Sequence, residues 1–470
     1  MANLKFGPEL MVIGDSVAQG CRSLTVNGAL CAQSYPATLA RLAGISGFAS
    51  PKHPRPVMID LEDIASNLIG AGLNIALGGI GANYAGWLAD FGVAEDERPV
   101  AFDNLAVAGT TLEDLAGEDS NPKGDPPVGK PALAKRYLDQ SPKFDIFDRA
   151  DRARLSNLHL AVNARYVLNP SNDPDHMGFS MLDWVFLRQP QNLILHAGHN
   201  NGFYPIGSRG DTSLWKAQWI DEPRPALAKY LQNLDQLEQA LPQTRILVLG
   251  LPKLGAVSNL MPDRDEGPHT KFPDYWETYW SVFPSAVRVP GSILKETDDE
   301  VAGINSILAE AVRSTVNRRK LWRYYSVYEF FDRYDTKNLL DQRESLNIGN
   351  YTITNNYIDA DRLRKPGPRN KPPEFRWKFR EGGFQSIDGM HPSLVGYTLL
   401  ACELVEWLTG QPLSQSARDR ELESAVEKER LIQTFPPGLK TILRKVRKTD
   451  EGQPEEPDDE ALAASVRQLR

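Results

Sequence analysis

The sequence predicts an α/β fold built on a parallel sheet with helices on both faces. Short apolar runs alternate with longer segments in which apolar residues recur every three or four positions. The first pattern is typical of buried strands and the second of amphipathic helices. Alternation of the two favours a parallel sheet covered on both sides, in which ligands bind at the carboxyl ends of the strands. The expected strands are 10–14, 101–109, 192–198, 245–252 and 323–331, and the expected helices are 36–44, 224–241, 301–322 and 393–410.

The spacing of these elements suggests one large domain over residues 1–410 and a tail over 411–470. Four connections are longer than those that usually join a strand to a helix, and we expect them to be insertions that carry helices and loops above the sheet. The tail is highly charged and contains QPEEPDDE, so we expect it to be helical or partly disordered and not part of the core. The expected insertions cover about 45–100, 112–190, 255–300 and 332–385.

Charge and cysteine content exclude several classes of protein. A net charge of -8 argues against non-specific binding to nucleic acid, which needs a basic face. Three cysteines are too few for a disulfide framework, although a bridge between Cys21 and Cys31 stays open as an alternative. We expect no signal peptide, because the first residues lack a basic region followed by an apolar one. The apolar stretch 68–82 is too short and too rich in glycine to span a bilayer. We therefore expect a cytoplasmic protein, with leaderless export as an open alternative.

Other segments carry weaker signals. In 272–283 six aromatic residues stand at helical spacing, and we expect an amphipathic helix packed on the sheet, with a lid over a ligand pocket as the alternative. Segment 435–448 has an apolar face and a basic face, as in a membrane-surface helix or a docked terminal helix. The polar cluster at 173–176 is more typical of a solvated loop than of a metal site. The glycine-rich stretch 68–82 lacks the spacing of a dinucleotide fingerprint.

A candidate nucleophile lies near the amino terminus. In ELMVIGDSVAQG, Ser16 follows an apolar strand directly, which places its hydroxyl at the strand's carboxyl end. A serine hydroxyl is a poor nucleophile until a neighbouring base takes its proton. His391 is the best candidate for this base, because Asp388 precedes it by three residues and a carboxylate at that spacing could orient the imidazole.

Two further strand ends supply possible hydrogen-bond donors. Gly109 ends NLAVAG, and Asn200 lies just after the strand that ends in LHAG. Together with the N–H of Ser16, the N–H of Gly109 and the amide of Asn200 could stabilise a developing oxyanion. Each short motif alone is more typical of ordinary structure, but their combination at one edge of one sheet favours a catalytic site.

These fragments resemble the four sequence blocks of the SGNH hydrolases, also called the GDSL esterase/lipase family, named for Ser, Gly, Asn and His. The first block, GDS, matches residues 14–16, and the second matches NLAVAG at 104–109. The third, G-x-N, matches 198–200. The last, D-x-x-H followed by proline, matches 388–392.

The resemblance implies a flavodoxin-like three-layer α/β/α fold and a set of residue roles. Ser16 would be the nucleophile, His391 the base and then the acid, and Asp388 the residue that orients His391. The oxyanion donors would be the N–H groups of Ser16 and Gly109 and the side chain of Asn200. This chemistry requires neither a metal nor an organic cofactor.

We therefore expect a serine esterase or lipase-like acylhydrolase that cleaves carboxylic esters of small molecules or lipids. The segments LVLGLPKLG and YYSVYEFFDRYD, at 247–255 and 324–335, are similar to the larger lipase/acylhydrolase branch of the family. An acyltransferase that uses the same acyl-enzyme is one alternative, and a non-catalytic binding or effector protein on this fold is another. We expect no nucleic-acid partner, and weak contact with a membrane surface through 435–448 stays open.

Overall fold

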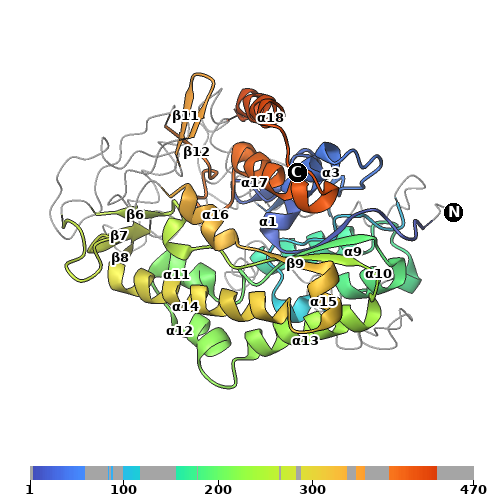
Figure 1. Cartoon of the computed structure of the whole chain (residues 1–470), viewed down its shortest axis with the longest axis horizontal. Helices are drawn as coiled ribbons and strands as arrows, with labels where there is room; N and C mark the ends of the chain where they lie inside the picture. Colours follow the sequence, from blue (N-terminus) through green and yellow to red (C-terminus); the bar gives the residue numbers. More distant parts are fainter. Residues whose placement is uncertain are drawn as a thin grey trace, which may run out of the picture.

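The computed structural model contains a central parallel sheet, as the sequence predicts (Figure 1). The sheet has four of the five expected strands. The strands lie in the order β1 (Met11–Gly14), β4 (Asn192–His196), β5 (Arg245–Leu249) and β9 (Trp322–Tyr325). All neighbouring pairs are parallel, so the four carboxyl ends meet at one edge of the sheet. The structure describes residues 4–58, 83, 86–87, 99–116, 155–176, 178–263, 266–281, 287–335, 346–354 and 381–430.

Alternate strand residues face two separate hydrophobic cores. Ile13 and Leu195 belong to one core, whereas Val12 and Ile194 belong to the other, as expected for strands buried on both faces. Helices close both cores, so the arrangement is compatible with three α/β/α layers. The first core is closed by α9 (Leu155–Leu168), α10 (Met181–Arg188), α13 (Pro225–Ala240) and α14 (Gly291–Ala311). The second is closed by α3 (Tyr35–Leu42), α16 (Val327–Arg333), α17 (Leu394–Thr409) and α18 (Gln415–Lys428).

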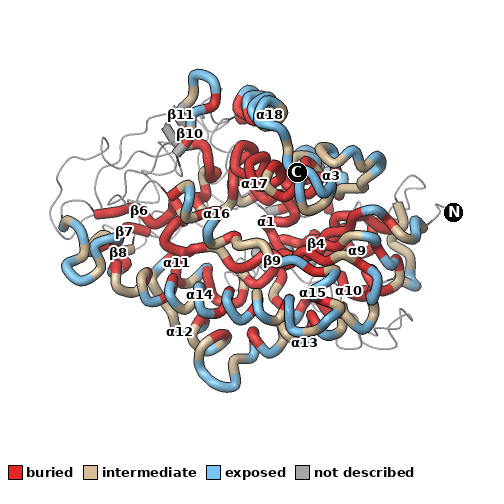
Figure 2. Tube along the Cα trace, viewed as in Figure 1, coloured by how far each residue is buried: buried red, intermediate tan, exposed pale blue. Residues whose placement is uncertain are grey.

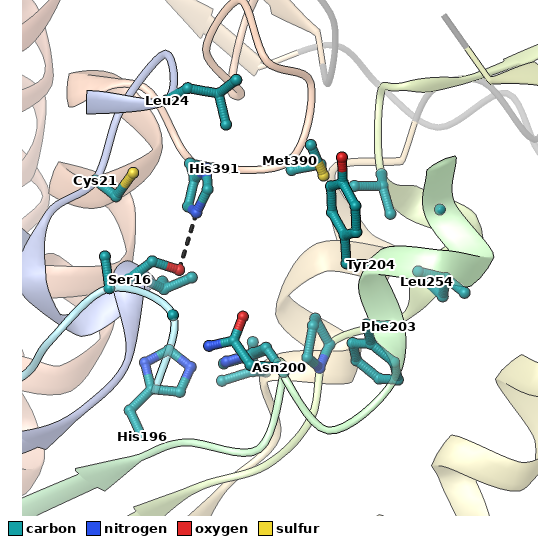
Figure 3. Close-up of a pocket in the computed structure, with 18 of the residues that line it drawn as sticks. Ser16, Cys21, Leu24, His196, Asn200, Phe203, Tyr204, Leu254, Met390 and His391 are labelled. Atoms are coloured by element: carbon teal, nitrogen blue, oxygen red, sulfur yellow. Dashed lines mark hydrogen bonds between the residues drawn. The ribbon is translucent and has the colours of Figure 1, made fainter. Parts of the chain in front are cut away.

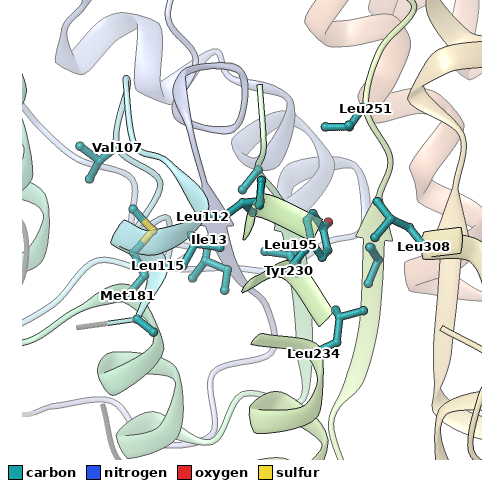
Figure 4. Packing of buried hydrophobic residues seen from close by; sticks show 14 of the residues in the cluster. Ile13, Val107, Leu112, Leu115, Met181, Leu195, Tyr230, Leu234, Leu251 and Leu308 are labelled. Atoms are coloured by element: carbon teal, nitrogen blue, oxygen red, sulfur yellow. The ribbon is translucent and has the colours of Figure 1, made fainter. Parts of the chain in front are cut away.

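Burial is deepest along the sheet and α17, while the outer sides of α13 and α14 are exposed (Figure 2). In the first core, Ile13 and Leu195 of the sheet lie among Met181 of α10, Tyr230 of α13 and Leu308 of α14 (Figure 4). These side chains are all completely buried. Removal of such a leucine or isoleucine side chain typically destabilises a protein by about 2–5 kcal/mol.

Smaller elements surround the two cores. Three sheets of two or three strands have the orders β2-β3, β6-β7-β8 and β10-β11-β12. Their strands are β2 (Thr25–Val26), β3 (Val57–Met58), β6 (Leu260–Pro262), β7 (Thr278–Ser281), β8 (Val287–Pro290), β10 (Leu346–Ile348), β11 (Tyr351–Thr354) and β12 (Glu381–Gly383). The remaining helices and turns are α1 (Ser16–Gln19), α2 (Gly28–Ala32), α6 (Leu112–Leu115), η2 (Pro174–His176), α11 (Phe203–Arg209), α12 (Ser213–Trp215), η3 (Lys216–Ile220), η4 (Leu254–Ala256) and α15 (Val316–Leu321).

Four element predictions need correction. Segment 101–109 runs beside β1, where the N–H of Leu105 donates to Val12, but it forms only an isolated bridge. The run 323–331 is divided between β9 and α16, because Ser326 caps a helix in its middle. The helix expected over 301–322 is two helices, α14 and α15. The described part of the aromatic segment 272–283, residues 272–281, contains β7 and no helix, so its helical spacing was misleading.

The expected tail also differs from the prediction. Helix α18 packs on α17, and its residues Leu422, Ala425 and Val426 are part of the second core. The expectation that the chain beyond residue 410 is not core is therefore wrong for this helix, whose charged residues lie on its outer side. Residues 431–470, which include the amphipathic segment 435–448, lie outside the described residues, as does the glycine-rich stretch 68–82.

Two further findings concern the cysteines and the helices of the described residues. Cys21, Cys31 and Cys402 are all free and buried, so the alternative of a bridge between Cys21 and Cys31 is wrong. Within the described part of the chain, no helix is long and apolar enough to cross a membrane.

Candidate active site

Ser16 is the first residue of α1, which follows β1 directly. A Cβ on Gly14 would lie only 2.0 Å from the carbonyl oxygen of His196, so glycine is needed where β1 approaches β4 this closely. Asp15 is the N-cap of α1, and its Oδ1 accepts a hydrogen bond from the N–H of Val17 at 3.3 Å. Ser16 is thereby held at the carboxyl edge of the sheet, with 9% of its surface exposed.

The imidazole of His391 lies between Ser16 and Asp388. Figure 3 shows its hydrogen bond to Ser16. Its Nε2 is 2.9 Å from Ser16 Oγ, and its Nδ1 is 2.8 Å from Asp388 Oδ2. An ionised carboxylate can only accept a hydrogen bond, so Nδ1 carries the proton and Nε2 presents its lone pair to the Ser16 hydroxyl. The structure therefore brings together the three residues that the sequence singled out, in the order that proton transfer from serine requires.

The carboxylate of Asp388 is buried and accepts hydrogen bonds on both oxygens. Oδ1 accepts from the N–H groups of Met390 and His391, each at 2.9 Å, and from the Ser386 hydroxyl at 3.1 Å. Oδ2 accepts from His391 Nδ1 and from the N–H of Leu24 at 2.9 Å. Burial raises the pKa of Asp388, but the charge of His391 and these hydrogen bonds outweigh it and lower the pKa to about 2. The carboxylate is therefore ionised at neutral pH.

The same environment affects His391. Burial lowers the pKa of its imidazole, because it disfavours the charged form. The sulfur of Cys21 and the carboxylate of Asp388 act in the opposite direction and are stronger, so the pKa of His391 lies well above its usual value. His391 is thus a stronger base than an exposed histidine.

Three hydrogen-bond donors face the space beside Ser16. The amide of Asn200 donates to the carbonyl oxygen of Thr110 at 2.8 Å, and this bond leaves its second hydrogen for a ligand. Among the described residues, none accepts a hydrogen bond from the N–H of Ser16 or of Gly109. Gly109 has a φ of +88°, a conformation that glycine adopts at little cost. The three predicted oxyanion donors therefore border one cavity together with Ser16.

A buried amide network supports the loop that carries Gly109. Oε1 of Gln19 accepts from the N–H of Ala108 at 2.8 Å. The side chains of Gln19 and Asn163 exchange two further hydrogen bonds, each of 2.8 Å, and His53 Nε2 lies 3.0 Å from Asn163 Oδ1. Gln19 is completely buried. It therefore positions the Gly109 N–H, a role that gives no signal in the sequence.

The cavity beside Ser16 has a volume of about 360 Å³. Ser16, Gly109, Asn200 and His391 all line it. Most of the remaining wall is apolar, as in sites that bind organic ligands. The apolar wall includes Leu24, Val57, Phe203, Leu254, Phe331 and Met390.

A strained turn brings Leu24 to this wall. Residues Arg22 to Thr25 form a tight hairpin, in which Arg22 and Thr25 exchange two backbone hydrogen bonds of 3.0 Å. The two central residues, Ser23 and Leu24, have φ angles of 53° and 56°. Two-residue turns of this kind favour asparagine and glycine, and a leucine in this conformation is an outlier. Such strained backbone conformations persist only where the surrounding structure stabilises them, and they are common at functional sites.

Hydrogen bonds to the loop that carries Asp388 hold this turn. The N–H of Ser23 donates to the Ser386 hydroxyl, and the N–H of Leu24 donates to Asp388 Oδ2, both at 2.9 Å. Behind the turn, Arg22 pairs at 3.5 Å with Glu429, a completely buried residue that also caps α17 by accepting from the N–H of Leu394. The turn and the residues after α18 therefore position Asp388 and His391.

Other candidates lie away from the cavity. Asp173 and His176 are 3.5 Å apart, and within the described residues there is no cluster of side chains that could hold a metal ion. Neither 173–176 nor the described part of 272–283 lines the cavity beside Ser16. The alternative that the aromatic segment forms its lid is thus not supported.

Two variants of Leu24 test the strain in the turn. In an ordinary loop, alanine is more stable than glycine by about 0.4–1 kcal/mol. At Leu24 we expect the reverse, because only alanine retains the left-handed penalty of about 1–2 kcal/mol. The free energy of unfolding, measured with urea, should therefore be about 1 kcal/mol higher for the Leu24→Gly protein than for the Leu24→Ala protein. If the alanine variant is the more stable, the turn is not strained.

Gln19→Leu tests the support of the Gly109 loop. The change removes the acceptor for the Ala108 N–H and displaces Gly109. If Ser16 turns over a reactive ester with the Gly109 N–H as a donor, kcat should fall about 10- to 100-fold. KM should change much less, because Gln19 does not line the cavity. Thermal unfolding of the same sample controls for misfolding. An unchanged kcat in a folded Gln19→Leu protein would contradict the positioning role.

Comparison with models of known protein families finds no match, and comparison with curated proteins finds no significant relative. What the site can do must therefore be judged from its geometry: a hydroxyl, an imidazole and a buried carboxylate in hydrogen-bonded series, beside three donors and an apolar cavity.

Proposed function

We propose that the protein is a serine esterase of the SGNH hydrolase type that cleaves carboxylic ester bonds through an acyl-enzyme on Ser16. The observation that carries the proposal is the hydrogen-bonded series Ser16 Oγ, His391 and Asp388, with links of 2.9 and 2.8 Å. The parallel sheet with helices on both faces is compatible with the flavodoxin-like fold of that family. The N–H groups of Ser16 and Gly109, which have no acceptor among the described residues, and the apolar cavity support the same proposal.

The reaction follows from the positions of these groups. His391 Nε2 takes the proton of the Ser16 hydroxyl as Oγ forms a bond to the ester carbonyl carbon. The N–H groups of Ser16 and Gly109 and the amide of Asn200 donate to the oxyanion. When the ester C–O bond breaks, the departing alkoxide takes the proton from Nε2 and leaves as the alcohol.

Deacylation repeats these steps with water. His391 takes a proton from a water molecule as its oxygen attacks the acyl carbon, and then returns the proton to Ser16 Oγ as the acid leaves. Asp388 remains ionised throughout and stabilises the imidazolium. An acyltransferase would differ only in the acceptor, so product analysis with added glycerol distinguishes the two activities.

The cavity favours a small-molecule or lipid ester with an apolar portion, because most of its wall consists of carbon atoms. The net charge of -8 speaks against a nucleic-acid partner. A cytoplasmic location remains part of this proposal. Contact with a membrane surface through 435–448 lies outside the described residues.

Labelling and kinetics with two variants test the proposal. A fluorophosphonate probe should label the wild-type protein, and Ser16→Ala should abolish both labelling and hydrolysis of p-nitrophenyl esters. Asn200→Ala should keep its fold but lose about 10²- to 10³-fold in kcat, because it removes one oxyanion donor. Full activity in Ser16→Ala would overturn the proposal, and absence of labelling in the wild type would favour a non-catalytic binding protein.

The pH dependence provides a separate test. His391 acts as a base only when neutral, and its pKa is raised, so kcat/KM should fall as the pH decreases through an apparent pKa above the usual histidine value of about 6.5. Asp388→Asn removes the neighbouring charge, so this acid limb should move to lower pH while kcat drops by about 10⁴. A wild-type limb at or below pH 6 would be inconsistent with the raised pKa.

A further inference from the structure

Two other histidines line the cavity and take no part in the proposed reaction. His196 is the last residue of β4, and His199 lies in the loop that follows. Their ring centroids are 4.9 Å apart. In Figure 3 the His196 ring lies below Ser16, on the side away from His391. His196 therefore forms part of the cavity floor opposite the proposed base, and His199 lines the same cavity.

The Nδ1 atom of each imidazole lies within hydrogen-bond distance of a buried polar side chain. His199 Nδ1 lies 2.5 Å from Oδ2 of Asp15, which is completely buried. Burial raises the pKa of Asp15, but the charge and hydrogen bond of His199 outweigh it and leave this pKa below its ordinary value. Asp15 is thus an ionised acceptor, and His199 Nδ1 carries a proton that it donates to Asp15. In the neutral tautomer that this hydrogen bond selects, His199 Nε2 carries no proton and is an acceptor.

His196 has the opposite arrangement. Its Nδ1 lies 3.1 Å from the hydroxyl of Tyr35, and both residues are completely buried. If Tyr35 donates to Nδ1, the phenol proton is satisfied and His196 Nε2 carries a hydrogen. The reverse assignment would leave the phenol proton without a partner, which is costly in a buried site. Burial lowers the pKa of His196 to about 3, so the ring is neutral and its Nε2 is a donor.

Both Nε2 atoms lack a protein partner. His196 Nε2 is buried and has no hydrogen-bond partner in the described part of the chain. His199 Nε2 likewise has no hydrogen bond to any described residue, and its ring is 12% exposed beside the cavity. Buried polar atoms without a partner are rare and require an explanation. A ligand in the cavity that carries a polar group would provide one.

We propose that His196 and His199 form a subsite that binds a hydroxyl group on the acyl part of the substrate, so that the preferred substrates are esters of short hydroxy acids. This inference rests on the proposed esterase function. A hydroxyl matches the site because it can accept from His196 Nε2 and donate to His199 Nε2. A carboxylate would place a second anion near the buried charge of Asp15, and an ammonium group would oppose the His196 N–H.

The position of the subsite selects the acyl side of the ester. His391 must reach the departing oxygen to protonate it, so the alcohol part of the substrate lies on the His391 side of Ser16. The acyl part then extends toward the opposite side, where Figure 3 shows His196. A site built to bind a hydroxyl discriminates strongly against an analogue without one, because its own polar groups are then left unpaired.

Matched esters test this subsite. We would compare ethyl 2- and 3-hydroxybutyrate with ethyl 2- and 3-methylbutyrate, in which a methyl group replaces the hydroxyl, and follow acid release in a pH-stat. At least one hydroxy ester should exceed its methyl analogue by about tenfold or more in kcat/KM. Hydroxyethyl butyrate should show no such advantage over propyl butyrate. No preference for either hydroxy acid, or a preference only for the hydroxylated alcohol, would overturn the proposal.

His199→Asn isolates the cavity-facing nitrogen. The asparagine amide can still donate to Asp15, as Nδ1 does, but has no atom in place of Nε2. The ratio of kcat/KM between hydroxy and methyl esters should fall toward one. His176→Asn is the matched control, because this histidine also lies beside an aspartate, Asp173, but is remote from the cavity; the ratio should then stay at the wild-type value. An unchanged ratio in a folded His199→Asn protein would contradict the subsite.

Binding to Ser16→Ala separates this proposal from the proposed function. Calorimetry should give a Kd for the preferred hydroxy ester about tenfold or more below that of its methyl analogue, and His199→Asn in the same background should remove the difference. This measurement needs no catalysis. Equal Kd values would reject the subsite even if the wild type is an esterase, whereas selective binding would support it even if fluorophosphonate labelling fails.

Discussion

The buried carboxylate of Asp388 is the interaction on which the site depends. Five donors satisfy it: three lie within its own loop, one is the His391 ring, and one is the N–H of Leu24 from the opposite end of the chain. A pKa of about 2 corresponds to about 2–3 kcal/mol of stability. Because this pKa is lowered by folding, the stabilisation is complete above the ordinary aspartate pKa of about 3.9 and is lost as the pH falls toward 2. At neutral pH the charge therefore joins two segments that are 364 residues apart in the sequence, around Leu24 and Asp388, beside Ser16.

A second buried carboxylate, Asp15, lies on the other side of Ser16 and accepts fewer hydrogen bonds than Asp388. It accepts from the N–H of Val17 and from His199, whereas Asp388 has three backbone donors in addition to its histidine. The ionised state of Asp15 thus depends more on its histidine. Loss of the Nδ1 donor at position 199 would leave a buried charge poorly compensated next to the proposed nucleophile, which is a severe penalty. Asparagine is consequently a more informative replacement there than an apolar residue.

The sequence was sufficient to single out Ser16, Gly109, Asn200 and His391, which line one cavity, and Asp388, which is hydrogen-bonded to His391. Ser16 and Asn200 follow parallel strands, and the carboxyl ends of such strands lie at one edge of the sheet. It was also sufficient for the strands β1, β4 and β5 and for the helices α3, α13 and α17. The sequence was insufficient to predict the roles of Leu24 and Glu429, because their partners lie far along the chain. The role of Leu24 also depends on its backbone N–H, which every residue except proline has. The prediction of a helix over the aromatic segment 272–283 was wrong for another reason. The spacing of its aromatic residues fits a helix, but antiparallel pairing of β7 with β6 and β8 decides the conformation.

The strained turn shows why local rules fail near this site. Two consecutive residues with positive φ turn the N–H groups of Ser23 and Leu24 toward Ser386 and Asp388. The strain, about 1–3 kcal/mol for each residue, is similar in size to the stabilisation of the Asp388 carboxylate. Glycine at position 24 would remove the strain there and keep the N–H, but it would also remove an apolar side chain from the cavity wall. Two roles together explain why position 24 is leucine. Its backbone N–H donates to the Asp388 carboxylate, and its side chain forms part of the cavity wall.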